Sequence, residues 1–210
     1  MDEAGFVAFI WVWAFLLAGV EIEIEAAHGW AERLPTWYRR RGLVGTVYGW
    51  FMARRPLTGY HVFQLPLPLL ALHLPYFFGQ DWTWGAEART LAIYFVLAVF
   101  WDYLWFVLNP AYTVRRFKRG NVWWFSGPWI GRFPLDYYIG LSLSCLLAAA
   151  TWLEDDRPAR LYEHLGLILG CAVLTGIAVL AAPLYHRWYR HMRRPGSDDR
   201  PITTITPPPS

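Results

Sequence analysis

The sequence has few charged side chains, which make up only 17% of its 210 residues. Soluble domains usually contain about 25% charged and about 45–50% apolar residues, whereas 56% of this chain is hydrophobic and 19% is aromatic. This composition argues against a soluble domain. The chain also contains 14 Trp residues, and indole rings prefer the interface between lipid and water. We therefore expect an integral membrane protein.

The chain also has few cysteines and a small net charge. These two features argue against a disulfide-stabilised protein and a nucleic-acid-binding protein, respectively. The two cysteines, Cys145 and Cys171, both lie in apolar runs, so a disulfide framework is not expected. The formal net charge is only +3, and the arginine clusters stand beside apolar segments, which argues against a nucleic acid partner. The N-terminus is acidic and lacks the positive start of a secretory signal, so we expect the first apolar segment to be retained.

Apolar segments close to the roughly 20 residues that a helix needs to cross a bilayer recur along the chain. They cover about residues 4–28, 59–78, 86–108, 134–153 and 161–185. We predict an all-α bundle of about five transmembrane helices within residues 1–194, followed by a disordered cytoplasmic tail over 195–210. The second segment contains Pro66, Pro68 and Pro75, which predict a kink or a break.

Basic residues concentrate in alternate connections, and this pattern predicts an orientation. Arginines gather in residues 33–55, 115–132 and 187–194, whereas the N-terminus and the other connections are acidic or mixed. The positive-inside rule then places the N-terminus outside and the C-terminus in the cytoplasm, which requires an odd number of crossings. We expect a multi-pass protein of the inner (cytoplasmic) membrane, surrounded by lipid bilayer. Homo-oligomers or other membrane proteins are further expected partners.

The first predicted helix ends with acidic residues that suggest a site. Ionisable groups within membrane helices are costly and mark functional positions. Glu21, Glu25 and His28 are spaced i, i+4, i+7, which places them on one helical face. Glu25 and His28 also have the Glu-x-x-His spacing of carboxylate metal sites, although a di-iron bundle needs this motif twice and we find it once. Alternatively, these glutamates are interfacial and face the arginines of the next connection.

Other polar residues stand where the predicted helices begin or end in the cytoplasmic half: His61, Gln64, Asp102, Asn109 and Asp136. With the predicted orientation, all of them fall in the same layer as the end of the first helix. Four helices would therefore contribute polar groups to one region. Alternatively, His61 is a structural histidine of the bundle, and Asp102 forms a salt bridge with a cytoplasmic arginine.

A divalent cation would offset the repulsion between buried carboxylates in this layer. Mixed His and carboxylate ligands suit iron, zinc or manganese. The predicted ligands are Glu25, His28, His61 and Asp102. Glu21 is expected to act as a catalytic base or to ligate a second ion. The residues expected to support the ligands are Gln64, Asn109 and Asp136.

Residues 102–110 read Asp-Tyr-Leu-Trp-Phe-Val-Leu-Asn-Pro, and a basic loop and a Trp-rich stretch at 123–125 follow. Over residues 100–138 this pattern resembles an uncharacterised group of small prokaryotic multi-pass membrane proteins that carry an acidic residue before Trp-Phe-Val-Leu-Asn-Pro. The resemblance implies a membrane protein and no particular activity. It also implies a His directly after the Trp-rich stretch, where this chain has Phe125. If that His is a metal ligand in the group, this chain lacks it, which argues against a shared metal site.

Three kinds of function are compatible with these features. The first is a membrane metalloenzyme acting on a lipid-like or apolar substrate near the cytoplasmic leaflet, since aromatic side chains can wall a pocket around the site. The second is a non-catalytic subunit or assembly factor of a membrane complex, because Gly166 and Gly170 have the spacing that lets helices approach closely. The third is an ion or proton transporter, favoured by acidic residues near a Pro-broken helix.

Overall fold

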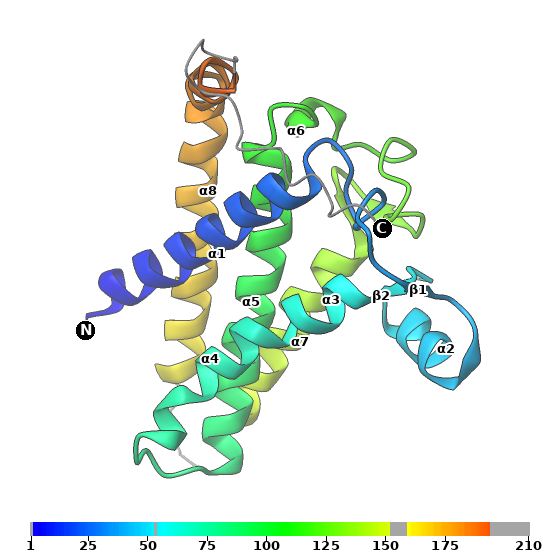
Figure 1. Ribbon diagram of the computed structural model, residues 1–210. Helices are drawn as coiled ribbons and strands as arrows, with labels where there is room; N and C mark the ends of the chain where they lie inside the picture. Colours follow the sequence, from blue (N-terminus) through cyan, green and yellow to red (C-terminus); the bar gives the residue numbers. More distant parts are fainter. Residues whose placement is uncertain (1, 53, 152–158, 194–210) are drawn as a thin grey trace, which may run out of the picture.

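The computed structural model describes residues 2–52, 54–151 and 159–193, and within them the chain is mostly helical (Figure 1). The helices are α1 (Glu3–Glu25), α2 (Gly42–Phe51), α3 (Gly59–Gln64), α4 (Pro66–Phe77), α5 (Trp84–Leu108), α6 (Thr113–Arg116), α7 (Leu135–Ala150) and α8 (Ala159–Met192). Two antiparallel pairs of short strands complete the fold. They are β1 (Tyr38–Arg39) with β2 (Leu57–Thr58), and β3 (Trp129–Ile130) with β4 (Phe133–Pro134).

Among the described residues, three helices are long and apolar enough to span a membrane: α1, α5 and α8. They correspond to the predicted segments 4–28, 86–108 and 161–185. The chain is therefore a helical protein with membrane-spanning candidates, whereas five crossings and their orientation stay predictions. The predicted tail at 195–210 lies outside the described residues.

The other two predicted spans differ in form from α1, α5 and α8. Segment 59–78 is divided into α3 and α4 at Leu65, and α4 begins at Pro66 and continues through Pro75. Because proline lacks an amide hydrogen, it fits the first turn of a helix better than its interior. The predicted segment 134–153 contains α7, which is apolar but has only 16 residues.

Side-chain caps set where several helices begin. Asp2 accepts a hydrogen bond from the amide of Gly5 at 2.8 Å and starts α1. Thr83 accepts from Ala86 at 3.1 Å and starts α5. Each cap satisfies an amide that has no partner within its helix. Thr58 starts α3 in the same way.

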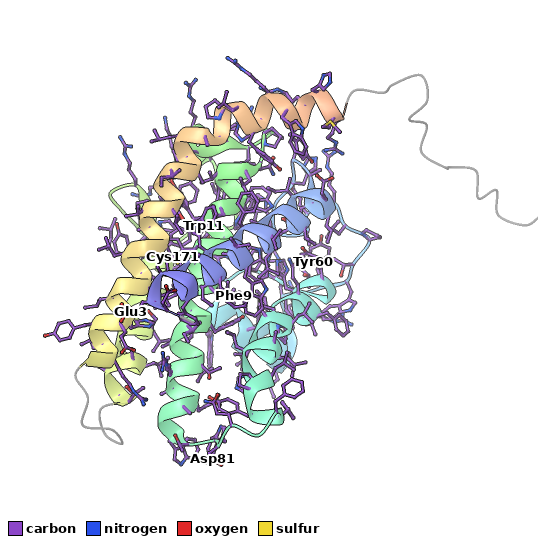
Figure 2. The ribbon with its side chains drawn as sticks, turned by 90° about the vertical axis from the view of Figure 1, so that its left-hand side faces the viewer. Glu3, Phe9, Trp11, Tyr60, Asp81 and Cys171 are labelled. Carbon is purple, nitrogen blue, oxygen red and sulfur yellow. The ribbon has the colours of Figure 1, made fainter. Side chains whose placement is uncertain are left out.

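Helix α5 is the centre of the bundle, and α1, α7 and α8 pack directly on it (Figure 1). Val96, Leu97 and Leu104 of α5 are completely buried. Figure 2 shows α1 crossing α8, with Trp11 and Cys171 labelled where the two helices meet. The indole Nε1 of Trp11 donates to Thr175 Oγ1 at 3.0 Å across this contact.

Aromatic rings from α5, α7 and the connection between them close one end of the bundle. Phe106 and Phe117 have ring centroids 4.4 Å apart, and Phe117 stacks on Tyr137 at 5.9 Å. Trp124 and Phe125 extend the same cluster. Aromatic pairs at these separations add stability beyond the area they bury. This end of α5 is consequently covered by packed side chains, and Asp102 lies one helical turn before Phe106.

Candidate functional site

Glu21, Glu25 and His61 form a compact group of donor atoms. Each offers one oxygen or nitrogen, and these atoms all lie within 4.8 Å of one another. The glutamates are one helical turn apart on α1, whereas His61 comes from α3. Glu25 is 5% exposed and His61 is 3% exposed. Two of the three donors are therefore buried, Glu21 is half-buried, and the group is assembled from two separate elements.

The three donors line a cavity of about 300 Å³. Its remaining charged groups are Asp102, Arg55 and Asp136. Much of the wall is aromatic, formed by residues that include Trp30, Trp101, Trp105, Phe106, Trp124, Phe125 and Tyr137. The cavity consequently combines an apolar interior with a few ionisable groups, which is the usual composition of a ligand pocket.

Carboxyl groups outnumber cationic groups in the cavity wall. Glu21, Glu25, Asp102 and Asp136 contribute four carboxyl groups, whereas Arg55 contributes one guanidinium. If all were ionised, the charge would be −4 + 1 = −3. A buried excess of one sign is unfavourable unless protons or a cation balance it. The arrangement can therefore hold a cation.

His61 is oriented by neighbours on two sides. Its Nδ1 lies 2.6 Å from Thr58 Oγ1, and its ring stacks on Trp30 at 4.2 Å between centroids with the planes inclined by 23°. Because Nδ1 is engaged by Thr58, Nε2 is the ring nitrogen available to a ligand. Histidines that bind metals are commonly held in this way through their other nitrogen.

A turn directly after α1 holds Glu25 in place. Ala26, Trp30 and Ala31 have positive φ angles of 53°, 57° and 54°, and they turn the chain back toward the helix. The amide of Ala31 then donates to Glu25 Oε1 at 2.5 Å. Gly29 is required in this turn because an added Cβ would overlap the ring of Trp124. The turn thus fixes the carboxylate of Glu25 beside Glu21 and His61.

Arg55 is a buried member of the site that sequence reasoning missed. Its Nε donates to the carbonyl oxygen of Trp124 at 2.6 Å, and its guanidinium forms an ion pair with Asp136. It also lies 4.8 Å from the ring centre of Trp30 and 4.3 Å from that of Phe125. In the sequence, Arg55 is one of several arginines in a connection predicted to be cytoplasmic. No local sequence pattern distinguishes it from the adjacent Arg54.

Phe125 has a role that differs from the one implied by the resemblance. A His is implied at that position, yet the Phe125 ring packs face-on against the Arg55 guanidinium. Both residues line the cavity. An aromatic face attracts a guanidinium, so Phe125 stabilises a charged wall residue and does not supply a ligand.

The predicted ligands His28 and Asp102 lie outside the donor group. His28 is half-buried, and its Nδ1 is 3.8 Å from Glu32 Oε2. The reason is that α1 ends at Glu25, so the helical spacing does not extend to His28. Asp102 lines the cavity and accepts a hydrogen bond from the Tyr137 hydroxyl.

The three predicted supporting residues have different places. Asn109 is 1% exposed, and its Nδ2 donates to the carbonyl oxygen of Ala26 at 2.6 Å. It therefore ties the end of α5 to the turn that holds Glu25. Asp136 pairs with the buried Arg55. Gln64 lies beside Tyr60 and is not among the residues that line the cavity.

Residues 100–138 carry the resemblance. They form the end of α5, the whole of α6, the strands β3 and β4, and the start of α7. It supplies a large part of the aromatic wall of the cavity, together with Asp102 and Asp136. The resemblance itself stays a prediction. Comparison with protein-family models, with curated proteins and with solved structures found no significant match for this chain.

Proposed function

We propose that this membrane protein binds a divalent cation through Glu21, Glu25 and His61 and is an enzyme acting on a lipid-like or apolar molecule. The observation that carries the proposal is the meeting of these three donors within 4.8 Å. They do so in a cavity whose wall has more carboxyl than cationic groups. Iron, zinc and manganese all accept mixed His and carboxylate ligands.

The spacing of the donors is compatible with one metal ion. Bonds of about 2.0–2.2 Å from zinc to nitrogen and oxygen place neighbouring ligand atoms roughly 3–4 Å apart. The longest separation allowed here is 4.8 Å, so a small rotation of the side chains would bring them into range. Glu21 then serves as a ligand. A bound metal would supply Lewis-acid activation of water, and Asp102, which also lines the cavity, would be the candidate proton acceptor.

The cavity wall supports an apolar substrate that comes from the bilayer. Ile139 and Leu143 of α7 line the cavity, and they are 55% and 38% exposed on the outside of the bundle. The cavity therefore reaches a surface that would face lipid. Trp105, also in the wall, has a buried indole N–H with no hydrogen-bond partner among the described residues. An oxygen atom of the substrate would satisfy this donor.

Charge favours an uncharged head group on that substrate. The cavity wall carries −3 when its groups are ionised, and a divalent cation changes the sum to −3 + 2 = −1. An anionic head group would be repelled by this remaining charge. We therefore favour a lipid-like alcohol, ketone or quinone over a phospholipid as the substrate class.

Metal content of the purified protein tests the proposal. We expect a stoichiometric divalent metal in the wild type, measured by inductively coupled plasma mass spectrometry after purification in metal-free buffer. His61→Ala and Glu25→Gln should each lose most of it, because each removes one of the donors. His28→Ala is the matched control, because His28 lies outside the group, and it should retain the metal.

Two results would contradict the metal site. One is a wild type that contains no stoichiometric metal even after incubation with iron, zinc or manganese. The other is equal metal in the wild type and in His61→Ala. Circular dichroism and size-exclusion chromatography of each variant show whether a loss of metal reflects a loss of folding.

A further inference from the structure

Helix α2 presents an apolar face that no other described part of the chain covers. Leu43, Val44 and Trp50 are 82%, 67% and 77% exposed, and Val47 is 37% exposed. Figure 1 shows α2 at the edge of the molecule, apart from the bundle formed by α1, α5, α7 and α8. Burial of these side chains is therefore not part of how the bundle is stabilised.

The two sides of α2 have different compositions. Leu43, Val47 and Trp50 are spaced i, i+4, i+7 and share one face. Gly45 and Gly49 lie on the opposite side, against the chain itself. A Cβ on Gly45 would be 3.1 Å from the backbone of Arg40, and one on Gly49 would be 3.7 Å from Arg54 Cα. The glycines allow α2 to lie close to its own flanking segments, which leaves the apolar face directed outward.

Exposed arginines flank this apolar face at both ends. Arg39, Arg40 and Arg41 precede α2 and Arg54 follows it. None of the four forms an ion pair with another described residue, in contrast to the adjacent Arg55. A short helix with an apolar face and flanking arginines is typical of segments that lie in the interface of an anionic membrane. At 10 residues, α2 is too short to cross a bilayer.

We propose that α2 is an interfacial anchor that binds anionic phospholipids. Leu43, Val47 and Trp50 insert among the upper acyl chains. The four flanking arginines contact the phosphate groups of the same leaflet. The partner is thus the surface of the bilayer in which the spanning helices are embedded. This proposal does not depend on the metal site.

The anchor is joined to the cavity by the short β1–β2 ladder. Tyr38 pairs with Thr58 and Arg39 pairs with Leu57, so the two ends of the α2 segment are held together. Thr58 in turn contacts His61. The interfacial segment and the cavity histidine are consequently attached to the same pair of strands, and this attachment sets the cavity close to the membrane surface.

Site-directed spin labelling measures the depth of α2. Cysteines at Leu43→Cys and Trp50→Cys are introduced into the full chain after Cys145→Ala and Cys171→Ala, and the labelled protein is reconstituted in liposomes. Collision rates with oxygen and with nickel ethylenediamine diacetate report lipid and water exposure, respectively. Lys118→Cys, in an exposed loop, is the aqueous reference.

In phosphatidylcholine liposomes that contain phosphatidylglycerol, the labels on α2 should show an oxygen-to-nickel accessibility ratio several-fold above that of the aqueous reference. Neutralising the four arginines with glutamine, or omitting phosphatidylglycerol, should reduce this ratio several-fold. Labels as accessible to nickel as the reference in anionic liposomes would overturn the proposal. Spin–spin broadening between labels of different copies would also overturn it, because it would show that a second copy covers this face.

Discussion

Replacing Arg55 with methionine tests how the cavity wall is held together. Arg55 is only 7% exposed, whereas the adjacent Arg54 is exposed and provides a matched control. The Arg55 Nε donates to the carbonyl oxygen of Trp124 at 2.6 Å, and its guanidinium pairs with Asp136. It also faces two aromatic rings. Methionine preserves much of the apolar stem but none of these polar interactions.

The contacts of Arg55 determine how much free energy of unfolding its replacement should cost. A hydrogen bond from a charged donor contributes about 1.5–3 kcal/mol, and each cation–π contact contributes about 0.5–1 kcal/mol. The ion pair adds less than about 1 kcal/mol, because Asp136 is 35% exposed and water screens it. We expect Arg55→Met to lower the free energy of unfolding by about 3–5 kcal/mol. Arg54→Met should change it by less than about 0.5 kcal/mol.

Equilibrium unfolding of the detergent-solubilised protein, followed by circular dichroism, measures both variants against the wild type. Asp136→Asn adds a second comparison, because it removes the ion pair, which water reaches on the Asp136 side, and leaves the hydrogen bond to Trp124. Its cost should be close to about 1 kcal/mol. The reasoning would be refuted if Arg55→Met and Arg54→Met were equally stable, since burial would then make no difference to the arginine.

Three further substitutions test the packing of α1 and the turn that follows it. Gly170→Leu should destabilise the protein by about 1–3 kcal/mol through overpacking, because even a Cβ there would lie 2.6 Å from Val7 Cγ1. Gly166→Leu, where a Cβ meets no atom within 4 Å, should leave the thermal midpoint unchanged, and equal losses at both glycines would contradict this packing. Asn109→Ala should cost about 1–3 kcal/mol, because the Ala26 carbonyl loses its donor. It should also lower metal retention, measured by mass spectrometry, and unchanged retention would count against its role in positioning the turn.

The long helices followed from the sequence because apolar length is a local property. A run of about 20 apolar residues satisfies its backbone in lipid only as a helix, and α1, α5 and α8 match three predicted segments. The shorter helices α4 and α7 have 12 and 16 residues. Their lengths fall below the full crossing distance, so hydropathy does not decide whether each spans the bilayer.

Part of the candidate site was also predictable, because it depends on the local geometry of one helix. Glu21 and Glu25 share a face because helical periodicity places residues four apart on one side, and both belong to the donor group. His28 does not follow this period, because the positive φ of Ala26 ends the helix first. That residue is an alanine, and nothing in its identity signals a left-handed conformation.

The sequence by itself determined that the chain has apolar helices long enough to span a membrane and that two glutamates share a face of the first. Hydropathy and helical period depend only on neighbouring residues, so both features follow from the sequence without knowledge of the tertiary structure. The sequence also placed His61 in the predicted ligand set, but only the tertiary structure decided which of the predicted ligands lie together and that Arg55, and not Arg54, is buried. These outcomes depend on the turn after α1 and on the pairing of β1 with β2. No local sequence pattern specifies that these segments come together.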